Sequence, residues 1–215
     1  MEQPLGIFGG TFDPVHLGHL HIALMAQKHL NLAKVKLIPC YQSPARLAPI
    51  ASPTDRANMI KLAIASYHLL SLDERELMRP QVSYTIETLK SLRHEFPATP
   101  LVLIIGSDAF ATLTSWHAWR KILDYAHLAV VNRPKTPLSD IGGFLSQYQT
   151  LDFLDFHQYL NGRILVIDLA ALEISSSQIR KLLREKKDIT SLVTKEVAEY
   201  IKQHNLYVKS EASNK

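Results

Sequence analysis

The sequence predicts a doubly wound α/β domain built around a mostly parallel β-sheet. Short apolar runs alternate with segments of helical period along most of the chain, which is the pattern of repeated strand–helix units. The run LVLIIG, from Leu101 to Gly106, is apolar throughout, as expected of a strand whose two faces are both covered. A length of 215 residues with 47% hydrophobic residues suits one domain of ordinary size.

The first elements follow this pattern closely. A strand from Leu5 to Phe8 precedes a glycine-rich loop, and apolar residues then recur at helical spacing from Leu17 to Leu30. A second strand, Val35 to Pro39, leads into a loop with three prolines. The next helix is predicted from Thr54 to Ala65, with Thr54 as its N-cap.

The alternation continues through the middle of the chain. A strand from His68 to Leu72 precedes an amphipathic helix from Tyr84 to Phe96. After the buried strand that ends at Gly106, we expect a short helix from Asp108 and another from Ala118 to Tyr125.

The last third predicts two further strands and two closing helices. The strands run from His127 to Val131 and from Arg163 to Asp168, while residues 135–162 between them show no clear period. The helices run from Ser176 to Lys186 and from Thr194 to His204. We therefore expect a single domain over residues 1–215, with a small C-terminal helical part at 175–207 and a flexible tail at 208–215.

Composition excludes several functional classes. A single cysteine, Cys40, rules out an internal disulfide framework and a cysteine-rich zinc site, and it is compatible with a reducing compartment. The net charge of +4 and an isoelectric point of about 9.1 suit an anionic ligand. Basic residues are interleaved with acidic ones instead of forming a stripe, so we expect no nucleic-acid partner. No secretion signal or membrane-length apolar run is present, so we predict a cytoplasmic protein without a membrane partner.

Ligands of such folds bind at the carboxyl ends of the strands, and the first such loop is GGTFDPVHLGH, Gly9 to His19. Glycines permit a sharp turn and a close approach to a ligand, and the following helix start attracts anions. His16 and His19 lie one turn apart, so their imidazoles can share a face and donate hydrogen bonds to phosphate. A strand–helix turn with incidental histidines remains an alternative. A metal site with His21 is weak, because His21 falls on another helix face.

Three later loops have a similar character. In IIGSDAF, Asp108 can accept hydrogen bonds from a ribose, or it can cap the next helix. In NRP, Arg133 ends a strand where it can clamp phosphate. In EISSSQIRKLL, Ser175 to Ser177 precede a helix that carries Arg180, which predicts a second anion-binding helix start, with one serine as its N-cap.

Together, GGTFDPVHLGH and ISSSQIR resemble the HxGH nucleotidylyltransferase superfamily, whose hallmarks are an HxGH loop and an ISS[ST]xxR loop. Within it, the chain from Gly6 to Tyr207 is similar to the bacterial nicotinate-nucleotide adenylyltransferases. The supporting segments are LDERELMRPQVSYTIETL, the GSD followed by Trp116, HLAVVNRP and EVAEYIKQHNLY. The resemblance implies a Rossmann-like fold and a role in NAD biosynthesis.

The resemblance also implies the reaction. The family transfers the adenylyl group of ATP to nicotinic acid mononucleotide, giving deamido-NAD and pyrophosphate, by direct attack of the mononucleotide phosphate on the α-phosphorus. Mg²⁺ is expected with ATP, bound through phosphates and water and not by a protein metal site. The implied catalytic residues are His16, His19, Arg46, Ser176 and Arg180.

By the same resemblance, ATP and the mononucleotide have separate sets of contacts. The implied ATP-binding residues are Gly9, Gly10, Thr11, Phe12, His16, His19, Gly106, Asp108, Arg133, Ile174, Ser175, Ser176, Ser177 and Arg180. The implied mononucleotide-binding residues are Thr11, Tyr84, Thr85, Trp116 and His117. Trp116 offers a flat face for the nicotinate ring, although its spacing alone equally suits a core tryptophan.

The chain departs from the family pattern after VKLIP. Cys40 replaces an asparagine, and SPAR replaces Pro-Pro-His-Lys or Pro-Pro-His-Arg, so Ala45 stands where the family has a histidine while Arg46 keeps the cation. Nicotinamide mononucleotide or phosphopantetheine as the acceptor, and a non-catalytic nucleotide-binding module, remain alternatives. The sequence leaves the oligomeric state, monomer or homodimer, undecided.

Overall fold

A computed structural model describes residues 2–44, 47–132, 142–169 and 172–208. Its centre is a six-stranded sheet with the strand order β3-β2-β1-β4-β5-β6, and every neighbouring pair is parallel. The strands are β1 (Leu5–Gly10), β2 (Lys34–Pro39), β3 (Leu70–Leu72), β4 (Leu101–Gly106), β5 (His127–Asn132) and β6 (Ile164–Asp168). The predicted Rossmann-like, doubly wound sheet is confirmed. The strand order reverses between β1 and β4, the point at which such sheets bind ligands.

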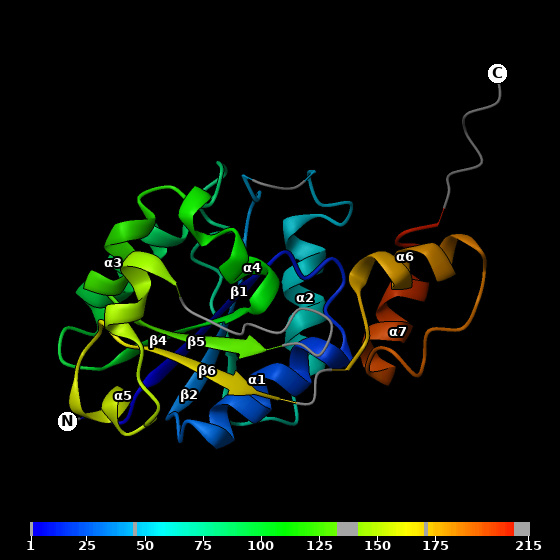
Figure 1. Ribbon diagram of the computed structural model, residues 1–215. Coiled ribbons are helices and arrows are strands. Elements are labelled where there is room, and N and C mark those ends of the chain that lie inside the picture. Colours follow the sequence, from blue (N-terminus) through cyan, green and yellow to red (C-terminus); the bar gives the residue numbers. More distant parts are fainter. Residues whose placement is uncertain (1, 45–46, 133–141, 170–171, 209–215) are drawn as a thin grey trace.

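Helices cover both faces of this sheet (Figure 1). The helices are α1 (Leu17–His29), α2 (Pro53–Ile64), α3 (Thr85–Glu95), α4 (Ser107–Ala111), α5 (Asp155–Gln158), α6 (Ser176–Arg184) and α7 (Lys195–Gln203). Three 3₁₀ helices are η1 (Leu113–Ser115), η2 (Trp119–Asp124) and η3 (Gly143–Tyr148). In Figure 1, α6 and α7 lie beyond the arrowheads of β5 and β6, at the end of the sheet where ligands are expected.

The apolar runs divide their side chains between two cores because successive strand residues point to opposite faces. On β4, Val102 and Ile104 join the core that includes residues of α1, α2 and α7. Leu101, Leu103 and Ile105 join the core under α3 and α4. This alternation explains why the central strands are apolar at every position.

Two predicted boundaries are wrong for local reasons. Helix α2 is capped by Ser52, whose hydroxyl accepts a hydrogen bond from the Asp55 amide at 3.1 Å, and not by Thr54. Pro53 takes the first helical position, where its missing N–H costs nothing. Strand β3 begins at Leu70 and not at His68, because the Leu70 amide donates to the Tyr67 carbonyl in a turn.

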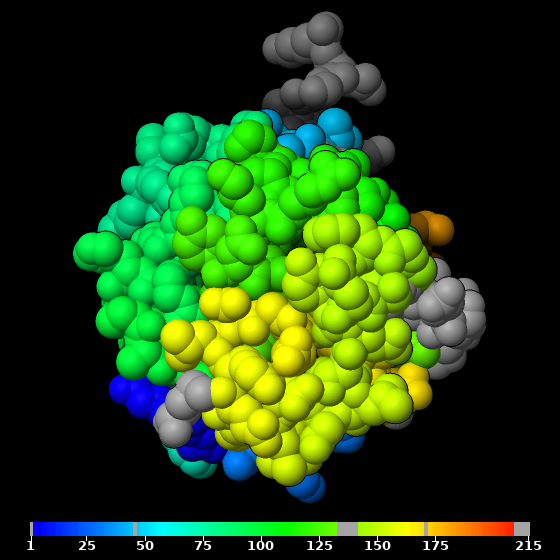
Figure 2. All heavy atoms as spheres, turned by 60° about the vertical axis from the view of Figure 1, so that its left-hand side comes forward, coloured from blue at the N-terminus to red at the C-terminus, as the bar shows by residue number. Residues whose placement is uncertain are grey.

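The segment without a readable period is ordered by packing and not by periodicity. Figure 2 shows its described part in yellow-green, spread beside the green segment that contains α3 and η2. The ring of Phe144 lies 6.1 Å from Trp119, and Phe156 stacks on His127 at 4.5 Å. The predicted helix from Ala118 to Tyr125 is the 3₁₀ helix η2, which is shorter.

His127 is a buried structural histidine at the start of β5. Its Nε2 donates to the Tyr159 carbonyl at 2.8 Å, and its Nδ1 accepts from the Arg163 amide at 3.1 Å. Burial lowers the pKa of His127 to about 4, because the charged ring would lose its hydration. The ring is therefore neutral at physiological pH.

Among the described helices, none combines the length and the apolar character needed to cross a bilayer. The tail predicted at 208–215 falls almost entirely outside the described residues. It and the division that sets residues 175–207 apart stay predictions.

Candidate functional site

The loop after β1 is built differently from the sequence expectation. Gly9 and Gly10 do not make the turn, because both lie in β1 and pair with Ile38 and Pro39 of β2. The chain turns at Phe12, which adopts a left-handed conformation with φ of 50°. The side chain of Phe12 is 1% exposed, so this predicted ATP-binding residue buries its ring under the loop.

His16 and His19 cap the start of α1 for each other. The His19 amide donates to Nδ1 of His16 and the His16 amide donates to Nδ1 of His19, both at 3.3 Å. The two rings stack with centroids 3.6 Å apart, and Phe12 contacts His19 edge-on at 4.8 Å. Because each Nδ1 accepts an N–H, each neutral ring carries its proton on Nε2. In this tautomer each ring can donate a hydrogen bond from Nε2 to a phosphate oxygen.

Gly18 packs closely against this pair. A Cβ atom at Gly18 would lie 3.0 Å from Nδ1 of His16 and 3.1 Å from its Cε1, a tight contact that would require the His16 ring to shift by a few tenths of an ångström. The same position lies 3.6 Å from Cβ of Ile174, which belongs to the predicted C-terminal loop. A side chain at this position would therefore press on the His16 ring, whereas its distance to the second loop would be an ordinary contact.

The C-terminal loop is joined directly to the first one. The Ser176 hydroxyl donates to the Pro14 carbonyl at 2.9 Å, and Nη1 of Arg180 donates to the Asp13 carbonyl at 2.6 Å. Ser175 is the N-cap of α6, and Ser177 accepts from Nη2 of Arg180 at 3.3 Å. Two motifs more than 160 residues apart in the sequence thus form one site.

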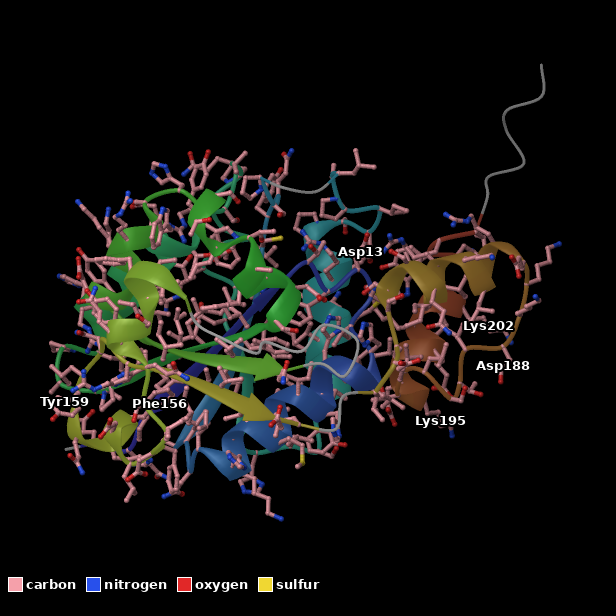
Figure 3. The ribbon with its side chains drawn as sticks, in the orientation of Figure 1. Asp13, Phe156, Tyr159, Asp188, Lys195 and Lys202 are labelled. Carbon is pink, nitrogen blue, oxygen red and sulfur yellow. The ribbon has the colours of Figure 1, made fainter. Side chains whose placement is uncertain are left out.

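Asp13 organises the contact between the two loops, and it is not among the site residues predicted from the sequence. Its buried carboxylate accepts from the amides of Ile50 and Ala51 at 2.8 and 3.0 Å and from the Tyr207 hydroxyl at 2.8 Å. Arg180 lies 3.8 Å from the same carboxylate. Figure 3 places Asp13 where the loop after β1 meets α6, and Phe156 and Tyr159 at the far end of the sheet.

The environment of Tyr207 follows from this contact. Burial and the neighbouring Asp13 carboxylate raise the pKa of Tyr207 far above its usual value, so its hydroxyl stays protonated and donates. A tyrosine near the end of the chain was not among the predicted site residues.

The GSD loop places Gly106 at the N-cap of α4 and Asp108 on the exposed side of the helix. No side chain caps this helix, so the structure does not support the alternative interpretation in which Asp108 is its N-cap. Helix α4 begins one residue earlier, at Ser107, directly after β4, so Asp108 lies near the carboxyl end of that strand.

The predicted acceptor residues come from two neighbouring segments. Tyr84 and Thr85 start α3, and the Tyr84 ring lies 4.7 Å from that of His117. Trp116 is half-buried against the second core, so it is not a fully buried core tryptophan. A cavity of about 290 Å³ adjoins Tyr84; its lining comprises Arg79, Gln81, Val82, Ser83, Tyr84 and Glu87.

Three positions singled out in the sequence, Ala45, Arg46 and Arg133, lie outside the described residues. In the part of the chain that the structure describes, no group of three or more His, Cys, Asp or Glu side chains is arranged to hold a metal ion. His21, the third histidine of the weak metal hypothesis, has its Nε2 buried on α1 without a hydrogen-bond partner among the described residues.

Comparison with known proteins now gives the family. A sequence model of cytidylyltransferase-like proteins matches residues 7–182. An Aeromonas hydrophila protein described as "Probable nicotinate-nucleotide adenylyltransferase" is 41% identical over 210 residues, covering 96% of this chain and 98% of that protein. A Coxiella burnetii protein with the same description is 43% identical over 209 residues, covering 94% and 97%. This chain belongs to the nicotinate-nucleotide adenylyltransferase family.

Solved structures agree with the fold of this family. The Plasmodium falciparum nicotinic acid mononucleotide adenylyltransferase complexed with APC superposes with a TM-score of 0.70 at 20% identity, covering 96% of this chain and 98% of that one. The same enzyme complexed with NaAD gives a TM-score of 0.71 at 19% identity over the same shares of the two chains. The relatives at 41% and 43% identity confirm the resemblance to the adenylyltransferase family, and the solved structures confirm the fold.

The two adenylyltransferase motifs contain the histidine and serine loops, but they do not contain all of the residues that contact these loops. Asp13, Tyr207 and the buried Arg56 of α2 were missed by sequence reasoning. One signal was available for Arg56: it lies three and four residues before Met59 and Ile60, which are both buried, so helical spacing places it on their face.

Proposed function

We propose that the chain transfers the adenylyl group of ATP to nicotinic acid mononucleotide, forming deamido-NAD and pyrophosphate. The observation that carries this proposal is the junction of the two loops through Ser176, Arg180 and the backbone of Asp13 and Pro14. It brings two imidazole N–H donors, a guanidinium and two helix N-termini to one end of the sheet. That is a set of groups suited to a polyphosphate.

The proposed step is a single displacement. An oxygen of the mononucleotide phosphate attacks the α-phosphorus of ATP, a new P–O bond forms there, and the bond to the β-phosphate oxygen breaks to release pyrophosphate. No protein nucleophile is required. The protein contributes by holding two anions in line and by stabilising charge on the leaving pyrophosphate.

The loops divide this work. His16 and His19 donate from Nε2 to phosphate oxygens, while Arg180 and the serines hold the β- and γ-phosphates together with Arg133. Gly9, Gly10 and Thr11 offer backbone groups, and Asp108 accepts from the adenosine ribose. Arg46 supplies a further cation near the reacting phosphates.

On the acceptor side, Trp116 stacks on the nicotinate ring, and the backbone of Thr85 and His117 meets its carboxylate, with Tyr84 alongside. A carboxylate accepts from these N–H groups, whereas the amide of nicotinamide mononucleotide would bring donors of its own toward them. This contrast supports nicotinic acid mononucleotide as the acceptor.

The groups at this site are compatible with Mg²⁺ that is bound to ATP. The groups expected to face the phosphates are N–H, O–H and guanidinium donors, which bind phosphate oxygens and not a cation. The ion would be bound by phosphate oxygens and water, and would neutralise charge on the polyphosphate.

Pyrophosphate release, measured with ATP and each acceptor in turn, tests the function. We expect turnover with nicotinic acid mononucleotide, and kcat/KM at least tenfold lower with nicotinamide mononucleotide and with phosphopantetheine. A preference for either of these would overturn the acceptor, and ATP binding without turnover would favour a non-catalytic nucleotide-binding module.

Stereochemistry tests the single displacement. With one diastereomer of ATP that carries sulfur on the α-phosphorus, direct attack inverts the configuration at phosphorus. Retention in the dinucleotide product would show two displacements and a covalent enzyme intermediate.

A further inference from the structure

Arg56 is a fully buried arginine that binds only backbone carbonyl oxygens. It projects from α2 and is 0% exposed. Its Nη1 donates to the carbonyls of Thr11 and Cys40 at 2.8 and 2.6 Å, and its Nη2 donates to the carbonyl of Tyr41 at 3.2 Å. Its Nε is buried without a hydrogen-bond partner among the described residues. Burying a guanidinium is costly, so these contacts require an explanation.

The bound carbonyls lie just beyond the point where β1 and β2 separate. Their ladder ends with the pair Gly10 and Pro39, followed by one more bond from the Cys40 amide to the Gly10 carbonyl at 2.9 Å. Beyond this bond, no backbone hydrogen bond joins the two segments among the described residues, and Nη1 of Arg56 donates to one carbonyl from each of them. The guanidinium therefore continues the connection between two strand-end loops that the sheet no longer pairs.

The connection extends to the segment expected to bind the mononucleotide. The Tyr41 amide donates to the Ser83 hydroxyl at 3.0 Å, and the Ser83 amide donates to the Gln42 carbonyl at 2.9 Å. Ser83 directly precedes Tyr84 and Thr85 at the start of α3. Hydrogen bonds thus run from Thr11 through Arg56 and the loop at 40–42 to the acceptor segment.

We propose that Arg56 is a positioning residue that fixes the spacing between the ATP loop at Thr11 and the acceptor segment at 83–85. This inference rests on the proposed function and assigns a residue outside the histidine and serine loops described above. Each loop keeps its own substrate contacts without Arg56, but their relative placement loosens. The rate of adenylyl transfer therefore depends on Arg56 more than the affinity for either substrate does.

The chain offers a matched control in Arg93 of α3. Its guanidinium also binds only backbone carbonyls, those of Phe96, Thr99, Tyr125 and Leu160, at 2.7 to 3.1 Å, and its Nε is likewise buried without a partner. These carbonyls lie before β4, β5 and β6, at the opposite end of the strands from the site. The same chemistry thus occurs once beside the proposed site and once far from it.

The test compares Arg56→Lys with Arg93→Lys. A lysine keeps the charge but loses the planar fork that reaches several carbonyls at once. We expect both variants to lose thermal stability. In single-turnover measurements at saturating ATP and mononucleotide, Arg56→Lys should lose at least tenfold in the transfer rate per folded molecule, with both apparent KM values within threefold of wild type. Arg93→Lys should stay within twofold in rate.

Three results would overturn the proposal: a transfer rate of Arg56→Lys within twofold of wild type, a loss confined to KM, or an equal loss in Arg93→Lys. If Arg56→Lys does not fold, Ser83→Ala interrupts the same series of hydrogen bonds further along. It should lower the transfer rate at least threefold while both KM values hold. An unchanged rate in Ser83→Ala would then overturn the proposal.

A second measurement separates this inference from the proposed function. If the wild-type protein forms no pyrophosphate, the proposed function fails. Hydrogen exchange of the Cys40 amide, measured without substrates, still tests whether Arg56 holds the loops at Thr11 and at 40–42 together. We expect exchange at least tenfold faster in Arg56→Lys than in Arg93→Lys. Equal exchange rates of the Cys40 amide in the two variants would overturn the positioning role of Arg56, whatever the activity of the wild type.

Discussion

At the scale of single residues, His16 and His19 each have two separable tasks. Nδ1 of each ring accepts a backbone N–H at the start of α1, while Nε2 carries the proton that the proposed chemistry uses. Substitutions that copy one nitrogen and remove the other can therefore separate helix capping from phosphate binding.

His19→Asn and His19→Gln make this separation. The shorter asparagine can accept the His16 amide as Nδ1 does, but it does not reach the Nε2 position. We expect near-wild-type thermal stability with a loss of turnover of about 10² to 10³, the effect of removing a preorganised donor from a charged transition state. Glutamine reaches the Nε2 position but not the cap, so it should keep more activity at lower stability.

Pyrophosphate release and thermal unfolding check both variants. Near-wild-type turnover in His19→Asn would contradict the proposed role of His19 as a donor to phosphate. The opposite ranking, with glutamine the less active variant, would show that capping and not donation sets the rate.

Cys40 is a buried thiol whose Sγ lies 3.8 Å from the Thr11 hydroxyl. Burial raises the pKa of Cys40 above its ordinary value, and this outweighs the opposing effects of Thr11 and Arg56. At pH 8 the native thiol should therefore react with a disulfide reagent at least tenfold more slowly than in the unfolded chain, since only the thiolate reacts. The reaction is followed by absorbance, and equal rates for the native protein and the unfolded chain would contradict the raised pKa of Cys40.

At the scale of elements, the segment from 142 to 169 holds the start of β5 through a neutral histidine. The unfolded chain protonates His127 near its ordinary pKa of 6.5, whereas the folded protein does so only near 4. The unfolded state thus binds more protons between these values, and stability falls as the pH drops through that window and is unaffected above it. The loss by pH 4 is about 3 kcal/mol.

Urea unfolding of wild type and His127→Gln between pH 7 and 4 tests this linkage. Glutamine can donate to the Tyr159 carbonyl and accept from the Arg163 amide, but it does not titrate. The variant should lose about 3 kcal/mol less stability over this range than the wild type. Parallel stability profiles would assign the acid sensitivity to other groups.

The strands could be predicted from the sequence, but the side-chain contacts that join the loops at their ends could not. Continuous apolar runs such as LVLIIG are typical of strands in a covered sheet, so the sheet and the positions of the histidine and serine loops could be predicted from local pattern. Arg56 and Asp13 look like ordinary polar residues of a helix and a turn, since their partners at Cys40, Ala51 and Tyr207 are distant in sequence. The part of 135–162 that the structure describes owes its shape to such distant packing.

At the scale of the whole molecule, Tyr207 attaches the C-terminal helices to the loop after β1. Tyr207→Phe removes one donor from the buried Asp13 carboxylate, and a hydrogen bond to a charged group contributes about 1.5 to 3 kcal/mol. Because Arg180 lies beside the same carboxylate, we also expect the KM for ATP to rise several-fold.

Tyr200→Phe is the matched control for this change. The Tyr200 hydroxyl donates to Asp55 at 2.9 Å, between α7 and α2 and away from the histidine loop. Thermal unfolding and ATP kinetics should show the larger stability loss and the KM change only in Tyr207→Phe. Equal effects in the two variants would mean that Tyr207 has no special link to the site.

The bond between Asp13 and Tyr207 joins residues 194 positions apart. During synthesis, the histidine loop leaves the ribosome long before the helix that carries Arg180 and before Tyr207. The carboxylate that both will contact is meanwhile exposed to water. The proposed catalytic centre therefore requires both distant segments to be in place, and we expect a chain truncated before α6 to hold the histidines but to perform no adenylyl transfer.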